Sequence, residues 1–170
     1  MKQRDPCYRF LVDKRAVIEK IVAAVSGELE LLARAAQAAH AEATHESSRA
    51  ENKYDTRGLE ASYLARGQSR QAAEAALAIE ELRQMPLRDF TAADEIDIGA
   101  LVETAGKREK NLYFILPRAG GTEVEVDGRE VLVITPQSPL GEQLIGRKQG
   151  DKLKLVIAGT ANELRIASVI

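Results

Sequence analysis

Two long stretches of the chain carry apolar and small residues at alternating spacings of four and three positions. The first runs through Ile18, Val22, Val25, Leu29, Leu32, Ala36, Ala39 and Ala43, and the second through Ala61, Ala65, Gln68, Ala72, Ala75, Ile79 and Leu82. That spacing places all members of a stretch on one side of an α-helix, as in a coiled coil. Because only a short polar stretch joins them, we expect an antiparallel helical hairpin.

The size of the residues along the two stretches predicts that the hairpin narrows toward its turn. Antiparallel pairing sets Ile18 near Leu82 at the base, and it sets alanines such as Ala39 near Ala61 at the far end. Small side chains let two helices approach closely. Taken as one helix, residues 13–46 would span about 50 Å at about 1.5 Å per residue. The pattern therefore indicates a long, slender arm.

Beyond residue 86 the pattern changes from a helical period to short runs of β-forming residues. Pro86 is expected to end the second helix, since proline disfavours helical geometry in the residue before it. Six runs follow, separated by Gly, Pro, Asn and Asp, and each is predicted to be a strand: residues 96–104, 111–117, 122–126, 131–135, 152–158 and 163–170. The fold class is therefore α+β, with the two kinds of structure segregated along the chain.

These patterns divide the chain into three parts. Residues 1–85 form the coiled-coil hairpin with its tip near 47–58, residues 86–95 form a linker, and residues 96–170 form a small β-rich domain. One helix is expected inside that domain, over residues 138–146. Ser138 suits the N-cap, Pro139 suits the first helical position, and Gly146 suits the exit.

The composition is that of an ordinary globular protein. The 170 residues are 45% hydrophobic and 29% charged, with a net charge of −2, so no broad basic face indicates direct binding to nucleic acid. No apolar run approaches the roughly 20 residues of a membrane span. The start of the chain lacks the apolar core of a secretion signal, and Cys7 is the single cysteine. We expect a cytoplasmic protein without a membrane partner.

Candidate catalytic chemistry is sparse. The two histidines, His40 and His45, lack the spacing of a zinc-binding helix and have no cysteine partners. No hydrolytic triad is visible. The chain is therefore not expected to be an enzyme in its own right.

The stretch from Val131 to Leu155, VLVITPQSPLGEQLIGRKQGDKLKL, resembles the signature of the GreA/GreB family of bacterial transcription elongation factors. The resemblance rests on the Ser138–Pro139 pair, the run Ile145–Lys148 and the Gly150–Asp151 turn. The order of parts agrees as well, with a helical hairpin before a β-rich domain. The resemblance therefore covers nearly the whole chain.

The resemblance implies an FKBP-like C-terminal domain that docks on RNA polymerase at the rim of the secondary channel. The residues that the family pattern assigns to docking are Gln137, Ser138, Pro139, Arg147 and Lys148. It further implies that the coiled coil enters the channel and promotes transcript cleavage in backtracked complexes. Contact with the nascent RNA and the DNA template would then be indirect, and we expect a monomer. Prolyl isomerase activity is not expected, because the domain has only two aromatic residues, Tyr113 and Phe114.

At the tip, the resemblance implies that carboxylates assist a Mg²⁺ ion of the polymerase, so the chain needs no cofactor of its own. Glu51, Asp55 and Glu46 are the catalytic candidates, and Glu51 is the candidate ligand of the shared Mg²⁺. Asn52 and Tyr54 are expected to support the tip.

The tip also departs from the family pattern. Ser48 stands where the first acidic residue of that pattern is expected, and Arg49 and Lys53 add positive charge. An alternative is therefore a Gre-like regulator that occupies the channel without stimulating cleavage. Two further readings stay open, a merely solvated turn and a coiled-coil adaptor unrelated to polymerase.

Overall fold

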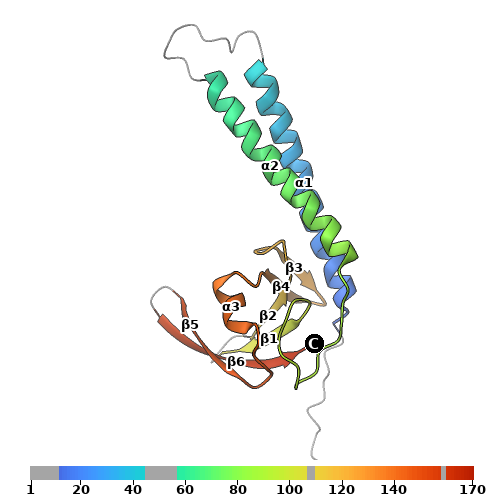
Figure 1. Cartoon of the computed structure of the whole chain (residues 1–170), viewed down its shortest axis with the longest axis vertical. Helices are drawn as coiled ribbons and strands as arrows, with labels where there is room; N and C mark the ends of the chain where they lie inside the picture. Colours follow the sequence, from blue (N-terminus) through green and yellow to red (C-terminus); the bar gives the residue numbers. More distant parts are fainter. Residues whose placement is uncertain (1–11, 45–56, 107–109, 158–159) are drawn as a thin grey trace, which may run out of the picture.

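The computed structural model describes residues 12–44, 57–106, 110–157 and 160–170. Two long helices, α1 (Lys14–Thr44) and α2 (Arg57–Gln84), form an antiparallel hairpin that projects away from the rest of the molecule (Figure 1). The 31 residues of α1 span about 46 Å at about 1.5 Å per residue. The hairpin predicted from the heptad pattern is confirmed.

The predicted apolar positions lie between the two helices. Ile18 and Leu82 are almost fully buried at the base, whereas Ala39 and Ala61 are buried toward the far end. One position along this seam is polar: the side-chain oxygen Oε1 of Gln68 is buried without a hydrogen-bond partner among the described residues. Small residues at the far end bury little apolar area, so most of the stabilisation of the hairpin comes from its base.

The β-rich part is one six-stranded sheet in the order β3-β4-β2-β1-β6-β5. Its strands are β1 (Leu101–Ala105), β2 (Lys110–Ile115), β3 (Glu123–Val126), β4 (Arg129–Ile134), β5 (Lys152–Ile157) and β6 (Thr160–Val169). All neighbouring strands are antiparallel except β2 and β4, which run parallel. The register of β1 against β6 shifts between Glu103 and Thr104.

The turn between β3 and β4 has a clear sequence cause. Asp127 and Gly128 both have positive φ angles, 52° and 72°. A two-residue hairpin turn of this kind matches the right-handed twist of its strands, and an Asp-Gly pair adopts it readily. This turn fixes the register in which Glu123 pairs with Leu132 and Glu125 pairs with Glu130.

The two faces of the sheet are covered by different elements. The base of the hairpin packs on one face, where Val17 and Ile21 of α1 join Phe114 and Val131 of the sheet in one buried cluster. On the other face, the short helix α3 (Pro139–Leu144) contributes Leu144, and the segment before β1 contributes Phe90 and Ile96. The arm and the sheet therefore share a continuous apolar core.

Polar contacts reinforce this joint. The Lys14 Nζ atom donates hydrogen bonds to the carbonyl oxygens of Arg88, at 2.6 Å, and Gly99, at 2.9 Å, and it lies 4.7 Å from the centre of the Phe90 ring. Further along the joint, Arg118 after β2 forms an ion pair with Glu81 of α2. The α+β architecture expected from the sequence is confirmed. Among the described residues, no helix combines the length and apolar character needed to cross a bilayer.

Candidate functional site

The expected site has two parts, and the structure describes one of them. The tip residues lie outside the described residues: Glu46, Glu51, Asn52, Tyr54 and Asp55. Their roles stay predictions. The second part, around α3, is described in full.

Ser138 starts α3 as the sequence predicts. Its backbone is extended, with φ −72° and ψ 152°, and its Oγ atom accepts a hydrogen bond of 3.1 Å from the Gly141 backbone N–H. The same hydroxyl donates to the carbonyl oxygen of Thr135 at 2.7 Å. Both hydrogen-bonding functions of the side chain are thus used locally, and the cap holds Gln137 and Pro139 exposed on either side.

Gly141 explains how the loop before α3 stays close to the helix. A Cβ atom at this position would lie 2.0 Å from the carbonyl oxygen of Thr135, so no other residue fits without moving the backbone. The loop from Thr135 to Ser138 is therefore pressed against the first turn of α3. This contact gives the Ser-Pro corner a fixed shape.

Hydrogen bonds also fix the C-terminal end of α3. Gly146 has a positive φ of 78°. Its backbone N–H donates a hydrogen bond to the carbonyl oxygen of Ile96 at 2.9 Å, and the Ile96 N–H donates one to the carbonyl oxygen of Arg147 at 2.8 Å. The Arg147 side chain donates to two carbonyl oxygens, those of Gln143 at 2.6 Å and Lys152 at 3.1 Å. Arg147 therefore stabilises the end of α3. The N–H groups that it uses for this are not available to hydrogen-bond a partner.

Lys148 is more open than Arg147. Its backbone N–H donates to the Asp151 carboxylate at 2.9 Å, which closes the turn before β5. Its side chain is about half exposed, with Nζ 3.8 Å from the Glu95 carboxylate. Such an exposed pair is weak, so Lys148 is available to a partner.

The predicted docking residues lie at the two ends of one short helix. The helix α3, which begins with Pro139 and has six residues, is about 9 Å long. The arrangement presents an exposed amide, a proline ring and a lysine at fixed spacing. It suits recognition of another surface. Among the described residues, no group of three or more His, Cys, Asp or Glu side chains is placed to hold a metal ion.

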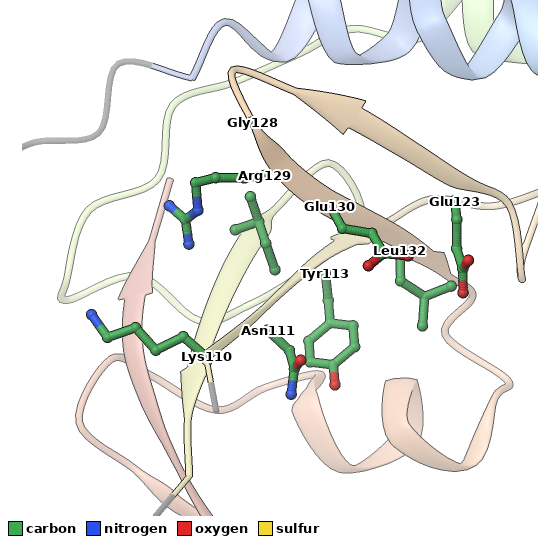
Figure 2. A pocket seen from close by; sticks show the side chains of 9 residues that line it. Lys110, Asn111, Tyr113, Glu123, Gly128, Arg129, Glu130 and Leu132 are labelled. Carbon is green, nitrogen blue, oxygen red and sulfur yellow. The ribbon is translucent and has the colours of Figure 1, made fainter. Parts of the chain in front are cut away.

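Sequence reasoning missed a hollow on the sheet beside α3. This hollow, of about 410 Å³, is lined by residues of β2, β3 and β4 (Figure 2). They are Lys110, Asn111, Leu112, Tyr113, Glu123, Gly128, Arg129, Glu130 and Leu132. The alternation of polar and apolar residues could have indicated it. Glu123 and Glu130 belong to the sheet face opposite to the one that carries the buried valines of β3 and β4.

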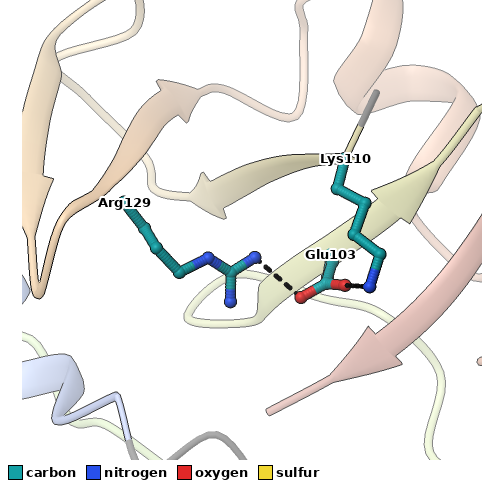
Figure 3. A network of polar contacts seen from close by, with 3 residues as sticks. All are labelled: Glu103, Lys110 and Arg129. Atoms are coloured by element: carbon teal, nitrogen blue, oxygen red, sulfur yellow. Dashed lines mark hydrogen bonds and ion pairs between the residues drawn. The ribbon is translucent and has the colours of Figure 1, made fainter. Parts of the chain in front are cut away.

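A buried carboxylate, also unpredicted, lies on the other face of the sheet. Glu103 of β1 is almost fully buried and forms ion pairs with Arg129 at 2.7 Å and Lys110 at 3.2 Å (Figure 3). Burial by itself would raise the pKa of Glu103, but the hydrogen bonds from Arg129 and Lys110 outweigh it, so the pKa lies below its ordinary value. This trio joins β1, β2 and β4.

Comparison with known proteins adds sequence relatives. No protein-family model matches the chain. Over 83 residues it is 32% identical to the transcription elongation factor GreA of Streptococcus pyogenes serotype M5 (strain Manfredo), covering 48% of each chain. It is 34% identical over 83 residues to GreA of Streptococcus uberis (strain ATCC BAA-854 / 0140J), with the same coverage. The chain thus spans about half the length of the curated relatives it matches.

Among solved structures, the chain is similar to GreA factor homolog 1 (Gfh1) of Thermus thermophilus, with 22% identity, a TM-score of 0.37, and coverage of 88% of this chain and 94% of that chain. It is also similar to Gfh1 of Thermus aquaticus, with 23% identity, a TM-score of 0.39, and coverage of 89% and 92%. The sequence relatives confirm the resemblance found in the residues themselves. Over these 83 residues, the chain is thus similar to GreA transcription elongation factors.

Proposed function

We propose that the protein is a Gre-like transcription elongation factor that binds RNA polymerase at its secondary channel and promotes transcript cleavage in backtracked complexes. The observation that carries this proposal is the slender hairpin fixed by a shared core to the β-rich part. A narrow arm of about 46 Å reaches into a space that a globular domain cannot enter. The similarity to GreA supports the same reading.

The β-rich part would be the docking module in this proposal. Gln137 and Pro139 are exposed beside the Ser138 cap, and Lys148 is exposed at the other end of α3. Because hydrogen bonds fix both ends of the helix, the backbone that carries these groups loses little conformational freedom on binding. That rigidity supports a docking role, and Arg147 would act mainly by holding the exit of the helix in place.

The tip would act on the polymerase active centre. Glu51, assisted by Asp55 or Glu46, would supply carboxylate oxygens, which are the ligands that Mg²⁺ prefers. The ion belongs to the polymerase, where it would stabilise an attacking water during cleavage of the phosphodiester bond. Asn52 and Tyr54 would hold the tip in shape. The protein itself would remain a factor rather than an enzyme.

One observation favours a second candidate function. Arg49 and Lys53 flank the acidic tip residues, and Ser48 replaces an acidic residue expected from the family pattern. Positive charge near a metal ion weakens its binding. The alternative is therefore a Gre-like regulator that occupies the same channel and slows or retunes polymerase without stimulating cleavage.

The test uses core RNA polymerase halted in a backtracked complex with end-labelled RNA and Mg²⁺. The intact protein, Glu51→Ala and Glu42→Ala are added separately, and RNA length is followed over time. Glu42 is an exposed carboxylate of α1 close to the tip, so its variant is the matched control. Rapid shortening that is lost only in Glu51→Ala is the expected result.

Two other outcomes decide between the remaining functions. No shortening, together with slower nucleotide addition that depends on the protein, would contradict cleavage and support the regulator. No effect on RNA and no binding to core polymerase would overturn both functions.

A further inference from the structure

The sheet face on which α3 packs also bears the hollow, which is lined by residues of β2, β3 and β4. Val124, Val126 and Val131 point into the core beneath the hairpin. Because side chains alternate along a strand, Glu123 and Glu125 of β3 and Glu130 of β4 belong to the opposite face. The hollow of about 410 Å³ lies on this face, with the buried Tyr113 and the half-buried Leu132 among its lining residues (Figure 2).

Two like charges on this face lower the stability of the sheet. Glu125 and Glu130 stand directly opposite each other in the β3–β4 register, and both are exposed. Like charges at paired positions destabilise a sheet. Acidic residues on β3 are explained in part by its place at the sheet edge, where charge discourages aggregation. That explanation does not extend to Glu130, because β4 is an interior strand.

The two carboxylates of the hollow are not used in ion pairs among the described residues. Within the described parts of the chain, neither Glu123 nor Glu130 forms an ion pair with a basic side chain. The two nearest basic residues on the strands, Arg129 and Lys110, bind the Glu103 carboxylate, and Figure 2 shows their side chains directed away from Glu123 and Glu130. Two carboxylates thus lie beside an aromatic ring and a leucine side chain.

We propose that this hollow receives a lysine or arginine side chain from an extended basic segment of the partner protein. The apolar stem of such a side chain would pack on Tyr113 and Leu132, and its charged end would meet Glu123 and Glu130. By binding Glu130, the cation also reduces the repulsion between Glu130 and Glu125, which are paired in the β3–β4 register. The hollow holds one or two side chains but not a folded element. The inference rests on the proposed function in that RNA polymerase would supply the segment.

The first experiment needs no polymerase. A short peptide, acetyl-Arg-Lys-Arg-Lys-amide, is titrated into the ¹⁵N-labelled full chain while amide shifts are recorded. The test variant is Glu123→Gln/Glu130→Gln. The control is Glu19→Gln/Glu163→Gln, which removes two exposed carboxylates elsewhere and makes the same change in net charge. Saturable shifts centred on Asn111, Tyr113 and Leu132, weakened about tenfold only in the test variant, are the expected result.

Shifts spread over all acidic surfaces, or equal in the two variants, would overturn the proposal. The same proteins are then bound to core polymerase at several salt concentrations. About tenfold weaker binding of the test variant, with a smaller dependence on salt, is expected. If the intact protein binds the peptide but not polymerase, the proposed function fails while the hollow stands. If the test variant binds polymerase as tightly as the control, the hollow has no role in docking and the proposal fails.

Discussion

The Nζ atom of Lys14 lies 2.9 Å from the carbonyl oxygen of Gly99, which ties the first residue of the hairpin to the residues that lead into the sheet. The same atom bonds the Arg88 carbonyl oxygen, so one buried ammonium group joins the arm, the connecting segment and the sheet. Burial lowers the pKa of Lys14 to about 8, although the nearby Asp89 opposes the shift.

The free energy of unfolding should therefore depend on pH through Lys14. In the unfolded chain the lysine keeps its proton up to about pH 10.5, whereas in the folded protein it loses the proton near pH 8. The unfolded state binds more protons in this interval, so stability should rise between pH 8 and 10.5, by up to about 3 kcal/mol. Urea denaturation at several pH values measures this rise.

Lys14→Met should remove that rise, because methionine does not titrate. Lys20→Met is the control, since it removes an exposed lysine from the same helix and should leave the rise in place. Parallel stability curves for the intact protein and Lys14→Met would contradict the assignment.

Two glycines should respond to alanine in opposite directions. At Gly141 the added Cβ would meet the Thr135 carbonyl oxygen at 2.0 Å, so Gly141→Ala should destabilise the protein by about 2–4 kcal/mol. At Gly67 in α2 nothing lies within 4 Å of the added atom, so Gly67→Ala should stabilise it by about 1 kcal/mol. Chemical denaturation of both variants checks the pair. Equal effects would mean that the contact at Gly141 is not what holds the Ser-Pro corner.

Glu103 should make the protein sensitive to acid. Its pKa is held below the ordinary value by Arg129 and Lys110, so it contributes stability above about pH 4.5 that is lost as the pH falls through its folded-state pKa. Glu103→Gln should cost roughly 2 kcal/mol at pH 7, because it leaves the two cations without their carboxylate. The difference from the intact protein should shrink in acid. Thermal unfolding between pH 7 and 3 measures it, with Glu163→Gln as the exposed control. A difference that stays constant with pH would rule out the titration of Glu103 as its source.

Periodic features of the fold could be predicted from the sequence, and features that depend on tertiary contact could not. The seam through Ile18 and Leu82 and the cap at Ser138 are local patterns, and both lie where they were expected. Val17 and Ile21 lie outside the heptad seam, and only the sheet packed against α1 explains their burial.

The candidate docking site divides in the same way. Arg147 was expected to face a partner, but its contacts with Gln143 and Lys152 depend on how α3 and β5 meet in space. Exposure of Gln137 and Pro139 follows from the helix start, which the sequence predicts. The hollow required knowledge of which strands are neighbours, because β2 and β4 are separated in sequence by β3.

The core shared by the hairpin and the sheet makes the molecule a lever with its fulcrum among Val17, Ile21 and Phe114. A tilt of one degree there displaces the far end of α1 by about 0.7 Å, because about 40 Å of the helix lies beyond Val17. A substitution that changes the packing between the hairpin and the sheet is therefore expected to move the far end of the arm, although no residue near that end has changed.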